Sequence, residues 1–134
     1  MNTTDKGDLT KIMLMARFMQ LGWIVLNPLS ENLRYDLVID RGNGFERVQC
    51  KTGRFSNGCV IFNTFSVSNP HLGGKRRNYI DEVELFGSFC QETQKCYLVP
   101  INKVGTEGRL RVDDPKRLSM NDKYPIRWAK DFEI

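Results

Sequence analysis

The stretch RYDLVIDRGNGFERVQCKT, residues 34–52, predicts the central element of the fold. Two runs rich in β-branched, aromatic and other apolar residues, 35–40 and 45–52, flank the sequence Gly42-Asn43-Gly44. Glycine and asparagine accept the left-handed backbone that tight hairpin turns require. We therefore expect a β-hairpin whose two strands are these runs.

Three polar residues of this hairpin, Asp36, Gln49 and Lys51, stand where a buried strand would carry apolar ones. If Gly42-Asn43 form the turn, Asp36 lies opposite Gln49, whereas a turn at Asn43-Gly44 places Asp36 opposite Lys51. Side chains alternate between the two faces of a strand, so in both registers the three polar residues share one face. The opposite face then holds apolar residues that can pack under a helix, namely Leu37, Ile39 and Val48.

The shared polar face has the donors needed for metal-assisted hydrolysis of a phosphodiester. The carboxylate of Asp36 and the amide oxygen of Gln49 are suitable ligands for a hard cation such as Mg²⁺ or Mn²⁺. The carbonyl of Cys50 lies between the two positions of the second strand. Lys51, about 6.6 Å along the strand from Gln49, could hold the attacking water or offset charge on the phosphate. A structural cross-strand ion pair is the alternative interpretation of the same residues.

A helix is predicted over residues 7–21, because apolar residues recur there at spacings of three and four. Gly22 is suited to end this helix, since glycine adopts the left-handed conformation without a steric penalty. The residues expected on its buried face are Leu9, Ile12, Met13, Ala16 and Met19.

Further strands are predicted around the hairpin from the remaining apolar runs. They cover residues 23–26, 59–67, 83–90, 95–101 and 110–112. Residues 69–78, NPHLGGKRRN, contain two glycines and three adjacent cations and are expected to form a basic loop. The helix and strands together fit one α/β domain with a mixed or mainly antiparallel sheet.

The composition is that of a globular protein, with 134 residues of which 40% are hydrophobic and 27% charged. Purely apolar runs such as residues 23–26 are too short to span a membrane, and the first residues lack the pattern of a signal peptide. We therefore expect a cytoplasmic protein. Four widely spaced cysteines and a single histidine argue against a zinc site or disulfides, so the cysteines are expected to be small buried residues.

The formal net charge is +4, and the basic residues are clustered. The clusters are Lys75-Arg76-Arg77, Arg109 with Arg111, Lys116-Arg117, and Arg127 with Lys130. We expect the first cluster, which follows Gly73-Gly74, to contact DNA. The other expected DNA contacts are Arg34, Arg54 and Asn57. Solvated surface charge without a ligand is the alternative explanation for any one cluster.

Five segments occur in an order that is much more specific than any one of them. They are KGDL (6–9), RYDLVID (34–40), VQCKT (48–52), CYLVP (96–100) and IRWAKDF (126–132). By this ordered set the chain resembles the PD-(D/E)xK endonuclease superfamily, and within it a small branch that includes a bacterial homing endonuclease encoded in a group I intron. The resemblance implies a single restriction-endonuclease-like domain, residues 1–134, with a central mixed sheet and flanking helices.

The resemblance also implies roles for individual residues. Asp36 matches the metal-binding aspartate and Lys51 the catalytic lysine, while Gln49 occupies a position usually held by Asp or Glu. Lys11 stands at the helix position where the family has a glutamate, which reverses the local charge. Asp8, one helical turn earlier, is an alternative acidic residue.

Three functions remain open at this stage. The resemblance favours a site-specific endonuclease of the homing type that hydrolyses double-stranded DNA with Mg²⁺ or Mn²⁺ and assembles as a dimer or tetramer. A Holliday-junction resolvase or repair nuclease of the same fold is the second. The third is a DNA-binding protein whose site is inactivated by Lys11.

Overall fold

The computed structural model describes residues 1–115 and 126–134, so the predicted basic pair Lys116-Arg117 lies outside the described residues. The helix is α1 (Thr3–Gln20). The strands are β1 (Ile24–Leu26), β2 (Leu37–Asp40), β3 (Phe45–Ser56), β4 (Cys59–Asn63), β5 (Phe65–Ser68), β6 (Lys75–Asn78), β7 (Leu85–Cys90), β8 (Lys95–Pro100) and β9 (Glu107–Arg111). The short 3-10 helices are η1 (Pro70–Leu72), η2 (Ile101–Lys103) and η3 (Ala129–Asp131).

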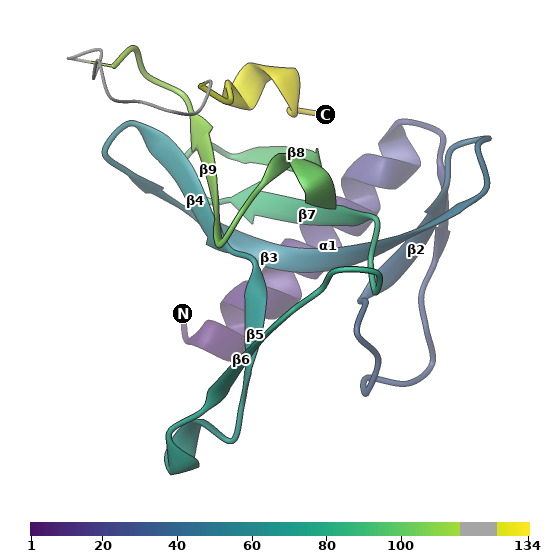
Figure 1. Cartoon of the computed structure of the whole chain (residues 1–134). Helices are drawn as coiled ribbons and strands as arrows, with labels where there is room; N and C mark the ends of the chain where they lie inside the picture. The colour runs from purple at the N-terminus through teal and green to yellow at the C-terminus, as the bar shows by residue number, and fades with distance from the viewer. Residues whose placement is uncertain (116–125) are drawn as a thin grey trace.

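Strand β3 organises the sheet, because three other strands pair with it (Figure 1). β2 and β4 run antiparallel to β3, whereas β7 runs parallel to it over residues 48–53. β1 adds to β2, β9 adds to β4, and β8 adds to β7, each in antiparallel pairing. The sheet is therefore mixed, and the predicted fold class is confirmed, with a single α-helix in the described part of the chain.

The β2–β3 hairpin adopts the first of the two predicted registers. Leu37 pairs with Val48, which places Asp36 opposite Gln49. The backbone N–H of Asp36 donates to the carbonyl of Val48 at 2.9 Å, which ties the residue before β2 to β3. The two glycines of the turn have φ angles of 100° and 94°, in the left-handed region that glycine adopts without strain.

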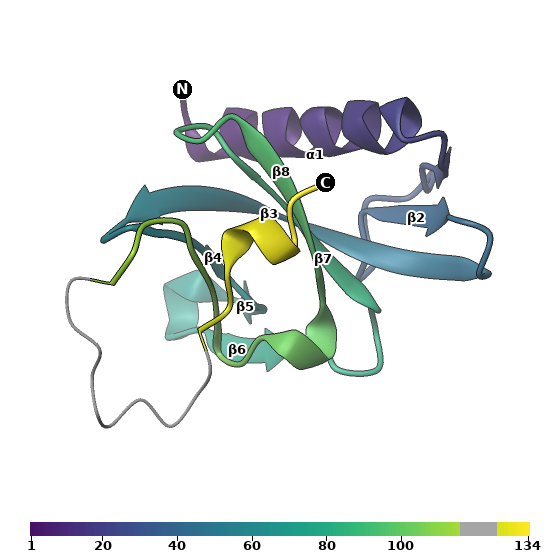
Figure 2. The same ribbon diagram turned by 90° about the horizontal axis from the view of Figure 1, so that it is seen from above.

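Two apolar clusters lie on the two faces of the sheet, one beneath α1 and one beneath β4, β9 and η3 (Figure 2). The cluster beneath α1 includes the three hairpin residues predicted to pack under a helix, Leu37, Ile39 and Val48. The second cluster includes Val60, Phe62, Tyr79, Phe86, Tyr97 and Leu110. The sheet is thus covered on both faces along β3 and β7.

Helix α1 begins at Thr3 rather than at residue 7, and its buried face differs in part from the predicted one. Asn2 caps it, with the side-chain oxygen accepting a hydrogen bond from the N–H of Asp5 at 2.8 Å. The buried residues of the helix are Thr10, Leu14 and Phe18. Of the predicted face, Leu9 and Met13 pack partly buried against the cluster beneath α1. In contrast, Ile12 is 61% exposed and Met19 is 66% exposed, so the predicted face is correct only in part.

Contacts with the sheet explain which face of α1 is buried. Leu14 packs over Gly87, where an added Cβ would lie only 3.1 Å from the leucine side chain. The hydroxyl groups of Thr10 and Thr52 share a hydrogen bond of 2.9 Å. Hydrophobic periodicity alone identifies neither the space above Gly87 nor the threonine pair, and for that reason it misses the centre of the buried face.

Residues 59–67 do not form one strand, and residues 69–78 do not form a simple loop. β4 ends at Asn63, and β5 leaves the sheet to pair with β6. Between β4 and β5, the hydroxyl of Thr64 donates to the carbonyl of Gly105 at 2.7 Å. The two-stranded unit β5–β6, called the ribbon below, projects from the body of the domain (Figure 1). The segment KRRN lacks the apolar alternation by which strands are predicted, which explains the error.

The structure also bears on the predictions for the strand at residues 110–112, for the cysteines and for membrane-spanning segments. β9 covers Glu107–Arg111 rather than residues 110–112. All four cysteines are free thiols, and three of them are buried as predicted, whereas Cys50 is partly buried. No helix in the described residues combines the length and the apolar character needed to span a bilayer.

Candidate active site

Alternation along β3 separates the side chains of residues 48–52 into two sets. Val48 and Cys50 pack against the apolar cluster beneath α1, and Thr52 bonds to Thr10 of the helix. Gln49 and Lys51 therefore face the other side of the sheet. The register of the hairpin places Asp36 opposite Gln49, on that same side.

The carboxylate of Asp36 lies at an edge of β3 that the neighbouring strand leaves open. β2 pairs with β3 only as far as Val48, and the next N–H on that edge, from Cys50, donates to Oδ2 of Asp36 at 3.0 Å. The N–H and C=O of one residue point to the same edge of a strand, so the Cys50 carbonyl also lies on the edge where Asp36 sits. Two groups with oxygen atoms that can bind a metal, a carboxylate and a carbonyl, thus share this edge.

The ammonium of Lys51 is held in a partly buried position. It donates to the carbonyl of Phe65 at 3.0 Å and to the hydroxyl of Tyr79 at 3.2 Å, and it lies 4.9 Å from the centre of the Tyr79 ring. Burial lowers the pKa of Lys51 to about 8, although the negative charge of Asp36 acts in the opposite direction. An ammonium has three donors, so one remains for a substrate or a water molecule.

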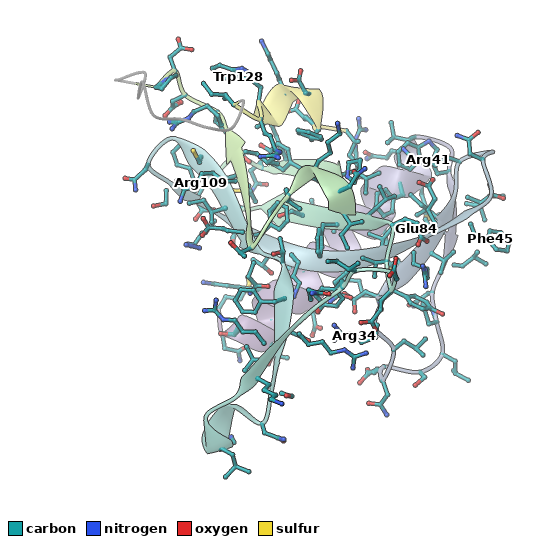
Figure 3. The ribbon with its side chains drawn as sticks, in the orientation of Figure 1. Arg34, Arg41, Phe45, Glu84, Arg109 and Trp128 are labelled. Carbon is teal, nitrogen blue, oxygen red and sulfur yellow. The ribbon has the colours of Figure 1, made fainter. Side chains whose placement is uncertain are left out.

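Arg34, an expected DNA contact, is engaged within the protein instead. Its guanidinium donates to Glu82 at 2.9 Å, to the hydroxyl of Ser66 at 2.7 Å and to the carbonyl of Asn78 at 2.8 Å. It also lies 4.2 Å from the centre of the Tyr79 ring. Figure 3 shows Arg34 close to the root of the ribbon. We conclude that Arg34 anchors the ribbon and the tyrosine that holds Lys51.

Lys11 lies on α1, next to the buried Thr10. Burial raises the pKa of the Cys50 thiol; the charge of Asp36 acts in the same direction, and the charge of Lys11 acts in the opposite one. Both charges therefore act on this thiol, whose side chain packs on the helix side of β3. That Lys11 lies at the candidate metal site stays a prediction.

The residues present supply oxygen ligands that suit a hard divalent cation, although their total negative charge is low. Asp36, the Gln49 amide and the Cys50 carbonyl offer oxygen donors of the kind that Mg²⁺ and Mn²⁺ prefer, and DNA phosphates can complete such a site. However, the described residues contain no group of three or more His, Cys, Asp or Glu side chains that could hold a metal. Asp36 is the one anionic donor among these three, and the positive charge of Lys11 opposes a cation.

Arg54 and Asn57, also expected to contact DNA, belong to the β3–β4 hairpin. Arg54 is exposed, with its guanidinium 3.9 Å from Glu107. Asn57 and Gly58 form the turn, with φ angles of 52° and 75°. The carbonyl of Asn57 accepts a hydrogen bond from Arg111 at 3.2 Å. This hairpin is separate from the network around Lys51, and its contact with DNA stays a prediction.

The cations of the expected basic loop lie on β6, and all of its residues are exposed. Arg77 pairs with Glu82 at 3.0 Å, so Glu82 connects it to Arg34. Arg76 instead lies 4.2 Å from the centre of the Phe65 ring. Neighbouring cations of one short strand therefore have different environments.

Tyr79, Glu82 and Ser66 complete the surroundings of the site, yet none of them is evident from the sequence. Ser66 lies on β5, and Tyr79 and Glu82 follow β6, so the pairing of these two strands brings all three near Arg34 and Lys51. Burial raises the pKa of Tyr79, which keeps its hydroxyl protonated at neutral pH. A hydroxyl acceptor for Lys51 carries no local sequence signal by which it could be found.

The fold and this site are those of a nuclease type of domain, and comparison with known proteins gives the family. The sequence model of the PD-(D/E)XK endonuclease family matches residues 1–134, and the chain belongs to this family. A solved structure, that of the bacterial homing endonuclease I-Ssp6803I, is similar with a TM-score of 0.74. The similarity covers 99% of this chain and 89% of that chain at 21% sequence identity, so it shows a shared fold. Comparison with curated proteins finds no significant match.

Proposed function

We propose that this protein is a cytoplasmic, site-specific double-strand DNA endonuclease of the homing type that depends on Mg²⁺ or Mn²⁺. The observation that carries the proposal is the placement of Lys51, whose ammonium is held by two acceptors on the side of the sheet shared with Asp36. Membership of the endonuclease family and the fold shared with a homing endonuclease support it.

In the proposed reaction, water adds to the phosphorus and the P–O3′ bond breaks, leaving a 5′-phosphate and a 3′-hydroxyl. When bound, a divalent cation supplies a Lewis acid for the scissile phosphate. Asp36, the Gln49 amide and the Cys50 carbonyl hold that cation. Lys51 uses its remaining N–H to orient the attacking water or to offset the charge that develops on the phosphate.

Symmetric assembly belongs to the same proposal. One chain of this size offers one site, whereas a double-strand break needs a reaction on each strand. A dimer or tetramer brings two copies of the Asp36–Lys51 site to the two strands. We expect light scattering of the protein to give a mass of two or four chains, and a monomeric mass would contradict this part of the proposal.

The test is cleavage mapping on a library of duplexes with randomised sequence, with and without Mg²⁺. We expect recurrent breaks at one sequence, with 5′-phosphate and 3′-hydroxyl ends, that disappear when Mg²⁺ is omitted. Asp36→Asn is the matched control, because it removes the anionic ligand while keeping the size of the side chain. Four-way junctions cleaved without sequence preference would favour the resolvase alternative instead.

One observation favours a second candidate, a DNA-binding protein with an inactivated site. The positive charge of Lys11 acts near the candidate metal ligands, where it opposes a bound cation. DNA binding without cleavage, in both the natural chain and the Lys11→Glu variant, would support this candidate and contradict the nuclease proposal.

A further inference from the structure

The ribbon has two chemically different faces. Residues directly opposite each other in an antiparallel pair share a face, and the pairs alternate from one face to the other. One face, called the polar face below, consists of the pairs Ser66 with Arg77 and Ser68 with Lys75. The reverse face consists of the pairs Phe65 with Asn78 and Val67 with Arg76.

The reverse face adjoins a cavity of the domain. The guanidinium of Arg76 lies 4.2 Å from the centre of the Phe65 ring. Phe65, Arg76 and Asn78 line a cavity of about 1020 Å³ whose other walls come mainly from residues 79–84 and 101–106, with Phe86 of β7. The side chain of Arg76 is therefore directed toward this cavity, and none of Asp36, Gln49 and Lys51 lines it.

The polar face lies on the side of the candidate active site. The hydroxyl of Ser66 accepts a hydrogen bond from Arg34, two residues before Asp36, at 2.7 Å. Arg77 shares the Glu82 carboxylate with Arg34. The carbonyl of Phe65 accepts from Lys51. The root of the ribbon is thus fixed relative to Lys51, so DNA at the site would meet the polar face.

Toward its tip, the polar face presents unused donors. Ser68 and Lys75 are both exposed, and within the described residues Lys75 forms no ion pair. The Ser68 hydroxyl makes only a long hydrogen bond, 3.4 Å, to the Lys75 carbonyl. Lysine and serine are side chains that read base edges in the major groove, and that groove admits a two-stranded β-ribbon.

We infer that the ribbon enters the major groove of the DNA with its polar face, where Lys75 and Ser68 contact base edges, whereas Arg76 makes no base contact. This inference rests on the proposed function. It divides the basic cluster predicted from the sequence: Lys75 specifies bases, Arg77 positions the ribbon through Glu82, and Arg76 supplies charge and packs on Phe65.

A matched pair of variants tests the inference, Lys75→Met and Arg76→Met. Each removes one positive charge from adjacent exposed positions and keeps an unbranched side chain. The probe is a pool of duplex DNA with randomised sequence, bound without divalent metal and sequenced after several rounds of enrichment. Equal thermal unfolding midpoints establish that both variants are folded.

We expect the natural chain to enrich a sequence motif. Lys75→Met loses the preference at one or two adjacent positions of the motif, with discrimination there falling about 10- to 100-fold. Arg76→Met keeps the motif, and both variants show a similarly reduced salt dependence of binding, because each loses about one phosphate-neutralising charge. Ser68→Ala relaxes the preference at the same block of positions to a smaller extent.

Two results would overturn the inference while leaving the proposed function intact. One is a motif that Lys75→Met preserves, and the other is a motif that Arg76→Met changes as much as Lys75→Met does. DNA binding without an enriched sequence motif would also contradict the inferred base contacts of the ribbon. If the natural chain binds no duplex at all, the proposed function itself fails, together with the inference.

Discussion

The two sides of strand β3 place neighbouring residues in opposite environments. On the helix side, Val48 and Cys50 pack in an apolar cluster whose central residues are fully buried. On the other side, Lys51 keeps an ammonium in a partly buried place, with hydrogen bonds to a carbonyl and a hydroxyl. Burial contributes to stability on the first side and opposes the charged form of a side chain on the second. Substitutions one residue apart should therefore affect different properties.

The largest expected effect is a loss of cleavage rate, on the side of β3 that carries Lys51. We predict that Lys51→Met lowers the rate of DNA cleavage about 10³-fold or more, because it removes a positioned cation from the developing charge. Stability should stay equal or rise, since a partly buried charge is replaced by an apolar side chain of similar length. Single-turnover cleavage and urea unfolding measure the two quantities. A large loss of stability in Lys51→Met would contradict the prediction that only the helix side of β3 contributes to stability.

On the helix side, the expected effect is on stability. Leu14→Ala leaves a gap above Gly87 in the apolar cluster, and we predict a loss of about 2–5 kcal/mol in the free energy of unfolding. Below the unfolding transition, cleavage should remain close to that of the natural chain. Ile12→Ala, on the exposed side of the same helix, is the control and should change stability by at most about 0.5 kcal/mol. Equal losses in the two variants would mean that the buried face of α1 is assigned incorrectly.

Lys11 lies on the helix, and its charge acts on the thiol of Cys50, the residue between Gln49 and Lys51. We predict that Lys11→Glu strengthens Mn²⁺ binding about 10- to 100-fold, because a repulsive charge becomes an attractive one. Cleavage should rise, DNA affinity should be equal or lower, and adding Asp36→Ala should abolish the gain. Calorimetric titration with Mn²⁺ reads the metal affinity independently of cleavage. Unchanged affinity would place Lys11 outside the site and make Asp8 the next residue to test.

The smallest expected effect is a dependence of stability on pH. The pKa of Lys51 is lowered from 10.5 to about 8 in the folded chain, so between these values the unfolded chain binds more protons. The free energy of unfolding should therefore gain a contribution as pH rises from about 8 to 10.5, on the order of 1–2 kcal/mol because the ammonium is partly exposed. The measurement compares urea unfolding of the natural chain and Lys51→Met without metal, which removes contributions that the two chains share. A constant difference between the chains would contradict the lowered pKa.

Much of the framework can be predicted because its signals are local. The turn glycines and the alternation of the hairpin predict Asp36, Gln49 and Lys51 on one side of the sheet, and one of the two predicted registers is correct. Strands β7 and β8 are apolar over most of their length, so their runs are equally clear in the sequence. Periodicity and turn chemistry require only a short window of sequence.

The errors share a different physical origin, which is contact between distant segments. The buried face of α1 depends on the space above Gly87, and the strand Lys75–Asn78 exists because β5 pairs with it. Arg34 is predicted to contact DNA, and the sequence does not show that its guanidinium is already bonded within the protein. Its three hydrogen-bond partners come from elements far along the chain, which no local pattern reveals.

The carboxylate of Asp36 takes the place of a neighbouring strand, because it accepts the N–H of Cys50 at 3.0 Å. An amide bonded to a carboxylate changes its NMR frequency when that carboxylate gains another partner. In a ¹⁵N-labelled chain, the Cys50 cross-peak is thus a built-in reporter of whatever Asp36 binds. It would register a cation or a phosphate at the site even when no DNA is cut.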